Sequence, residues 1–221
     1  MKKFLLPIFF LASAFLSQIL PSTTLTYDEK TGEKHLETTY RVTEKEGERL
    51  IQSENAKESY SLIYSDSYQL KKMTYASKEN SDHYDITLSG STLLFEGTVN
   101  GEQKRKTFTL TRRSWIQNFP FGLIPLAASE QNSTSFVVLN TKDLSLYQMR
   151  AKKMEESTIT LQGQTYHVQR IEIRLTGFKG LFWKAEIWFD TETHQMVRYQ
   201  TNEGPHTPTT TLEFVSKRPS F

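Results

Sequence analysis

Five histidines are the side chains of this sequence best suited to metal binding or to acid–base chemistry near neutral pH. They are His35, His83, His167, His194 and His206, and no two of them are separated by two or four residues. Such a spacing would place two imidazoles on the same face of a strand or helix, where they could share one metal ion. We therefore expect exposed histidines in turns and at strand ends, and no metal site.

Other signatures of catalysis and cofactor binding are missing from the sequence. There is no cysteine, which excludes disulfides, thiolate metal sites, cysteine catalysis and the lipid-modified cysteine of a bacterial lipoprotein. No G-x-S-x-G motif is present, and no glycine-rich loop joins a strand to a helix. We expect no cofactor and no enzymatic activity; a catalytic site would require His83, His167 or His194 to meet a carboxylate in a cleft.

Two segments rich in aromatic residues are the positive feature of the sequence. Residues 115–128 (WIQNFPFGLIPLAA), here called the uncharged segment, and residues 177–190 (GFKGLFWKAEIWFD) contain all three tryptophans. Aromatic side chains dominate the packing of any core, so one interpretation is structural. The other is that the uncharged segment lines an apolar cavity or, if exposed, an association surface. The candidate ligand-binding residues are Trp115, Phe119, Phe121, Leu123, Ile124, Trp183 and Trp188.

The elements that must position these residues are strands. Apolar and polar residues alternate along much of the chain, as at Leu36, Tyr40 and Val42, which predicts one buried and one wet face. Short polar turns separate the runs, and Asn100-Gly101 is the strongest because both residues tolerate the positive φ of a type I′ turn. We predict nine to eleven strands in one curved antiparallel sheet or incomplete β-barrel. Residues 143–156 could form a short helix, but we favour a strand there.

The uncharged segment interrupts this pattern. It shows no alternation, and its Pro120, Gly122 and Pro125 prevent one long helix. We expect this apolar non-strand segment to pack across one opening of the sheet.

The N-terminus has the features of an export signal. Lys2 and Lys3 precede an apolar run over residues 4–11 and a small-residue pattern at 12–14, which predicts a secretory signal over residues 1–22 and one β domain over 23–221. The 27 Lys and Arg residues exceed the 25 Asp and Glu residues only through these two lysines, so no basic field favours nucleic acid. No later segment is long and apolar enough for a transmembrane helix, and the strands carry too many charges for an outer-membrane barrel.

The C-terminal part resembles a known architecture. The motifs QTYHV (164–168), IEI (171–173), AEIWFDTET (185–193) and MVRY (196–199) are similar to the last strands of exported bacterial proteins of unknown function and of LolA/LolB-type periplasmic half-barrels. The resemblance covers residues 159–215 and implies a periplasmic half-barrel with an apolar cavity. The sequence departs from LolB in having no lipobox cysteine, and no clear lid helices precede its strands.

Together these features favour an exported, non-enzymatic binding or carrier protein for an apolar or amphipathic cell-envelope molecule such as a lipid. The alternative is a structural or interaction module of the envelope, in which the uncharged segment docks on a protein partner.

Overall fold

The computed structural model describes residues 22–111, 113–177, 183–202 and 207–220. The predicted signal of residues 1–22 therefore lies almost entirely outside the described residues. The elements, in chain order, are β1 (Ser22–Thr31), β2 (Lys34–Lys45), β3 (Glu48–Glu54), β4 (Glu58–Ser65), β5 (Leu70–Ser77), β6 (His83–Ser89), β7 (Thr92–Val99), β8 (Glu102–Thr109), β9 (Ser114–Trp115), α1 (Phe119–Gly122), α2 (Ile124–Ala128), β10 (Ser133–Asn140), β11 (Ser145–Leu161), β12 (Gln164–Leu175), β13 (Lys184–Asp190), β14 (Met196–Asn202) and β15 (Thr209–Ser220).

All fifteen strands belong to one curved sheet, so the predicted fold class is confirmed although the strands are more numerous than expected. Their order is β8 back to β1, then β15 back to β9. The first and last strands thus pair in the middle of the sheet, while β8 and β9, which follow one another in the chain, form its two edges. Every described pair is antiparallel except β9–β10.

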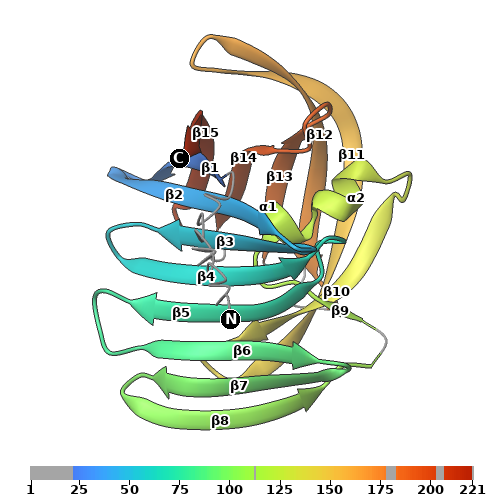
Figure 1. Ribbon diagram of the computed structural model, residues 1–221. Helices are drawn as coiled ribbons and strands as arrows, with labels where there is room; N and C mark the ends of the chain where they lie inside the picture. The colour runs from blue at the N-terminus through green and yellow to red at the C-terminus, as the bar shows by residue number, and fades with distance from the viewer. Residues whose placement is uncertain (1–21, 112, 178–182, 203–206, 221) are drawn as a thin grey trace, which may run out of the picture.

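Figure 1 shows how this sheet wraps around itself: β2 to β8 are stacked on one side, β10 to β13 stand on the other, and α1 and α2 lie between them. The result is an incomplete barrel, because its edge strands do not pair with each other. The face that surrounds the two helices is called the inner face below. No helix among the described residues has the length and apolar character needed to cross a membrane.

Local sequence explains the strands and their turns. Along β2, the apolar positions predicted to share a face are the less exposed ones, with Tyr40 buried and Arg41 exposed. The Asn100-Gly101 turn has φ values of 54° and 75°, as a type I′ turn requires. The strand predicted within residues 143–156 is confirmed as part of the long strand β11, which begins at Ser145 and continues to Leu161.

Aromatic side chains fill much of the inner face. The registers of β4 to β6 place Tyr60, Tyr75 and Tyr84 side by side, and the Tyr75 and Tyr84 rings stack with centroids 4.7 Å apart. Gly97 of β7 lies opposite Tyr84 with φ +152°. A Cβ atom there would come within 2.4 Å of the Tyr84 Cα. Gly97 therefore provides the space that lets the two strands approach at this point.

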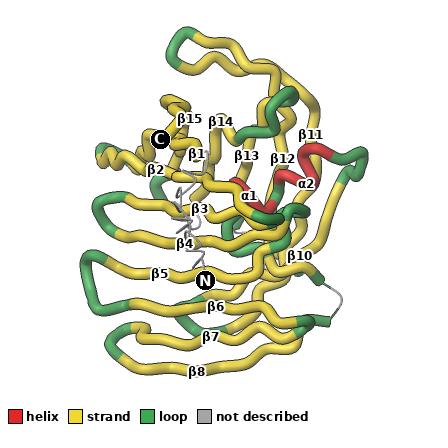
Figure 2. The backbone as a smooth tube through the Cα atoms, viewed as in Figure 1, coloured by secondary structure: helices red, strands yellow, loops and turns green. Residues whose placement is uncertain are grey.

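The uncharged segment bridges the two walls of the incomplete barrel, and Figure 2 shows its two short helices inside the curve of the strands. The Phe121 ring packs edge-on against Tyr40 of β2, with 5.4 Å between centroids. Phe119 contacts the opposite wall, 5.9 Å from the Phe136 ring of β10. The prediction of a non-strand segment across the opening is therefore confirmed. One long helix is absent from it, as expected from its prolines, and the segment instead forms two short helices.

The amide side chain of Gln117 fixes the start of this segment to the sheet. Its Nε2 donates to the Leu139 carbonyl at 2.9 Å, and its Oε1 accepts from the Leu139 N–H at 3.1 Å. The same oxygen accepts from Trp115 Nε1 at 3.0 Å. Gln117 thus reproduces the hydrogen-bonding pattern of a strand residue beside β10, just before the chain turns inward.

Candidate ligand-binding groove

An apolar groove of about 450 Å³ lies between the uncharged segment and the inner face of β1 to β3. Phe121 and Ile124 form one wall, and the residues of the opposite wall come from alternate positions of neighbouring strands. The side chains that make the groove apolar are Leu25, Tyr27, Val42, Ile51, Tyr68, Pro120, Phe121, Ile124, Ala128 and Met196. Its volume lies within the range of about 300–1,000 Å³ that is usual for small-molecule sites.

The sheet register explains why these strand residues meet. Val42 pairs with Thr23 on one side and with Ile51 on the other, so all three side chains point to the inner face at the same level. At the base of the groove, the Tyr27 hydroxyl donates to the Met196 carbonyl at 2.9 Å. Burial raises the pKa of Tyr27 well above its ordinary value, which keeps this hydroxyl protonated as a donor.

Ionisable side chains other than Tyr are also among the residues that line the groove: Glu44, Arg49, His194 and Lys217. Arg49 Nε lies 2.7 Å from the Glu44 carboxylate, and its guanidinium stacks over the Tyr68 ring at 4.3 Å. Lys217 of β15 lines the rim, and His194 lines it from the turn before β14. The groove therefore combines an apolar floor with a polar entrance, an arrangement suited to an amphipathic molecule.

The seven candidate residues do not form one site. Phe121 and Ile124 line the groove. Trp115 is 2% exposed and borders a separate hollow on the other side of α2, and Leu123 is fully buried. Phe119 and Trp183 are both partly buried and pair with each other, with centroids 6.4 Å apart.

Trp188 belongs to a different part of the molecule. It packs in a second apolar cluster with Leu161, Val168 and Val197, where the β11–β12 hairpin meets β13 and β14. Arg198 lies over its ring at 5.9 Å. Trp188 therefore does not line the groove.

The other groove residues carry no distinctive signal in the sequence. Leu25, Val42 and Ile51 have the same alternating pattern as every other strand core, and only the register shows that they end beside the uncharged segment. Arg49 and Lys217 belong to charge-rich stretches that resemble a solvated surface.

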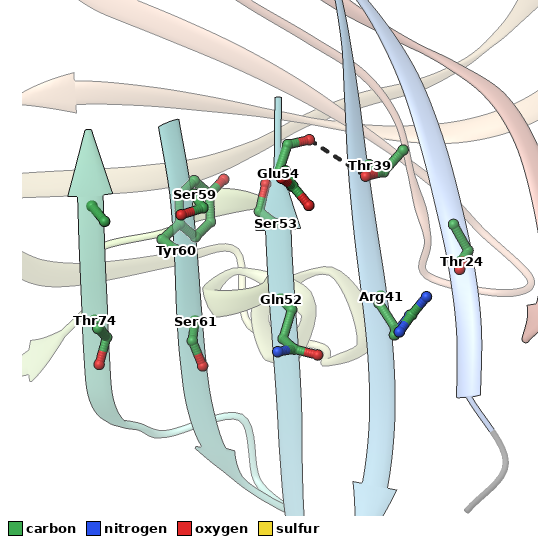
Figure 3. Close-up of a pocket in the computed structure, with 11 residues that line it drawn as sticks. Thr24, Thr39, Arg41, Gln52, Ser53, Glu54, Ser59, Tyr60, Ser61 and Thr74 are labelled. Carbon is green, nitrogen blue, oxygen red and sulfur yellow. Dashed lines mark hydrogen bonds between the residues drawn. The ribbon is translucent and has the colours of Figure 1, made fainter. Parts of the chain in front are cut away.

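A hollow of about 610 Å³ on the outer face of β1 to β5 is different in character. Figure 3 shows polar side chains from neighbouring strands along it, including Thr24, Arg41, Gln52, Ser61 and Thr74. The Thr39 hydroxyl donates to the Glu54 carbonyl at 3.4 Å. This surface lacks the large aliphatic side chains that an acyl chain would contact.

The histidines occupy scattered positions. His35 Nδ1 lies 3.5 Å from a carboxylate oxygen of Asp28, His83 bonds to the Ser81 carbonyl and His167 is exposed on β12. His206 lies outside the described residues. Within the part of the chain that the structure describes, no three His, Asp or Glu side chains are grouped closely enough to hold a metal ion.

Comparison with solved structures identifies the architecture. A β-barrel-like protein of the domain of unknown function DUF1849 from Brucella abortus superposes with a TM-score of 0.63 at 8% identity, over 91% of this chain and 98% of that chain. The two chains share a fold. No protein-family model matches the sequence, and no curated protein matches it.

Other matching structures include proteins of the types expected from the C-terminal hairpin. The hypothetical lipoprotein YmcC from Escherichia coli matches with a TM-score of 0.41 at 12% identity, over 90% of this chain and 89% of that chain. The LolA superfamily protein NE2245 from Nitrosomonas europaea matches with a TM-score of 0.26 at 8% identity, over 91% and 86%. The DUF1849 structure is the match that shows the shared open, β-barrel-like fold.

Proposed function

We propose that this protein is an exported, non-enzymatic binding or carrier protein that holds the acyl chain of an amphipathic envelope molecule in the groove beside α1 and α2. The observation that carries the proposal is the groove itself, in which aliphatic and aromatic side chains of three strands face Phe121 and Ile124 below a charged rim. Burying an acyl chain there would be favourable by about 0.8 kcal/mol per methylene group removed from water.

The exposure of the uncharged segment favours this proposal over a protein-docking module. Phe121 is 7% exposed and Leu123 is fully buried, so neither side chain is available to a partner protein. Among the described residues, Val215 is the one large apolar side chain that is exposed, and it lies on β15. The side chains of Phe121 and Leu123 are thus turned toward the sheet and the groove.

Two measurements test the proposal. First, the protein purified from its native source is extracted with organic solvent, and the extract is analysed by mass spectrometry for stoichiometric acyl-chain molecules. Second, binding of palmitate is measured by calorimetry for the wild type and for Val42→Trp, whose indole would occupy the groove between Thr23 and Ile51. We expect Val42→Trp to weaken binding at least about 10-fold, the equivalent of about 1.4 kcal/mol.

Thr43→Trp is the matched control, because the next residue of the same strand points to the opposite face. It should bind palmitate within about twofold of the wild type. Equal binding by wild type and Val42→Trp, together with an extract free of acyl chains, would refute the proposed function.

A further inference from the structure

A lysine stands on the inner face of the sheet at the entrance to the groove. Lys217 of β15 pairs across the ladder with Leu25 of β1, so the two side chains point to the same face. Both line the groove, yet Leu25 is 6% exposed and Lys217 is exposed. The aliphatic stem of Lys217 can therefore extend along the apolar wall while its ammonium group stays at the entrance.

The other strongly charged groups of the rim neutralise each other. Arg49 forms an ion pair with Glu44, donates from its guanidinium to the Asp66 carbonyl at 2.5 Å and stacks over Tyr68. Glu44 is the one carboxylate side chain among the residues that line the groove. Lys217 has no ion-pair partner among the described residues, so its positive charge at the entrance is not compensated.

We propose that Lys217 binds the anionic head group of the amphiphile whose chain lies in the groove, and that the ligand class is therefore an acyl-chain molecule with a carboxylate or phosphate at its head. The inference rests on the function proposed above. A lysine ammonium donates to oxygens of either group without imposing a fixed geometry, and such charge-assisted hydrogen bonds are stronger than neutral ones. The uncompensated charge selects against neutral and cationic head groups.

The experiment compares three probes with the same palmitoyl chain: palmitate, lysophosphatidylglycerol and zwitterionic lysophosphatidylcholine, all below their critical micelle concentrations. The proteins are the wild type, Lys217→Glu and Arg218→Glu. Arg218 is the matched control because it is the next residue of β15, is also exposed, and pairs with Thr24 on the outer face. Urea unfolding checks that each variant is folded.

We expect the wild type to bind at least one of the anionic probes on the order of 10-fold more tightly than lysophosphatidylcholine. Lys217→Glu should abolish this preference and change lysophosphatidylcholine binding less than twofold, whereas Arg218→Glu should keep the preference. Preference for palmitate alone identifies a carboxylate head group, and preference for lysophosphatidylglycerol alone identifies a phosphate.

Two other outcomes separate the inference from the proposed function. Equal affinity of the wild type for all three probes, or an equal effect of Lys217→Glu and Arg218→Glu, overturns the role of Lys217 and leaves the acyl-chain groove standing. If the wild type binds none of the three probes and Val42→Trp behaves in the same way, the proposed function itself is overturned.

Discussion

Gly97 offers a direct test of how the inner face is packed, through its replacement by alanine. The Cβ of Gly97→Ala would lie 2.3 Å from the His83 carbonyl oxygen and 2.4 Å from the Tyr84 Cα, far inside normal contact. Both are backbone atoms, so no side-chain rotation relieves the clash. The residue also has φ +152°, a conformation that side chains other than glycine rarely adopt.

The expected cost follows from these two effects. Forcing a methyl group into a packed site costs typically about 1–3 kcal/mol, and unfavourable backbone conformation adds about 1–3 kcal/mol. We therefore expect Gly97→Ala to lower the free energy of unfolding by about 3–5 kcal/mol, a large share of the 5–15 kcal/mol typical of a domain. Urea unfolding followed by tryptophan fluorescence measures this difference.

Gly90→Ala is the control, since Gly90 also has positive φ (+59°) but has no atom within 4 Å of the added Cβ. It should cost only about 1–2 kcal/mol, the penalty of a left-handed backbone. The double variant Gly97→Ala/Tyr84→Ala should not recover stability, because the clash involves backbone atoms. A Gly97→Ala protein as stable as Gly90→Ala, or one rescued by removing the Tyr84 ring, would refute this account of the packing.

Three further predictions concern the uncharged segment and the interior. Replacing Gln117 with Ala leaves Trp115 Nε1 and both backbone groups of Leu139 without their partner. The free energy of unfolding, measured in urea, should fall by about 2–4 kcal/mol. An effect below about 0.5 kcal/mol would contradict the role of this amide. Leu123→Ala should cost about 3 kcal/mol and lower Tm by roughly 6–12 °C in calorimetry, because Leu123 is fully buried, and an unchanged Tm would show that the segment is not anchored by it. Burial, assisted by the charge of Glu58, raises the pKa of Tyr75 from 10.0 to about 12. The protonated phenol thus contributes stability that is complete below pH 10 and is lost as the pH rises toward 12. The free energy of unfolding of Tyr75→Phe should therefore fall less steeply over this pH range than that of the wild type, and identical slopes would contradict the shift.

The sequence was sufficient to predict the strands of the sheet but not the pairing of β1 with β15 at its centre. Alternation identified the inner-face positions of β2, and the chemistry of Asn100-Gly101 identified a hairpin whose φ values agree. These signals are local, whereas the pairing of β1 with β15 depends on contacts between the two ends of the described chain. No local pattern encodes such a pairing.

The candidate site was predictable only in part, because its signals in the sequence are also local. Prolines and the absence of charge marked the segment that contributes Phe121 and Ile124 to the groove. Period-two alternation shows which face a side chain occupies, but not which level of the barrel it reaches. From the sequence pattern, Val42 and Ile51 therefore could not be distinguished from other core residues. Lys217 could not be distinguished from the other surface lysines.

The position of the β1–β15 ladder bears on how this chain folds. Ser22 lies opposite Ser220, whereas every other antiparallel ladder joins strands that follow one another in the chain. The protein therefore consists of two meanders, β1–β8 and β9–β15, that form from local contacts and are joined by a single ladder of high contact order. We expect each meander to gain structure before that ladder closes.

The same topology suggests that the chain can be divided. A cut between β8 and β9 leaves every ladder within one piece except β1–β15. Side-chain contacts such as Phe121–Tyr40 and the Asn118–Tyr60 hydrogen bond also join the two pieces. Fragments 22–110 and 114–220 are thus natural partners for complementation. A circular permutant joined from residue 220 to residue 22 and opened at the same point would convert the ladder of longest sequence separation into a hairpin.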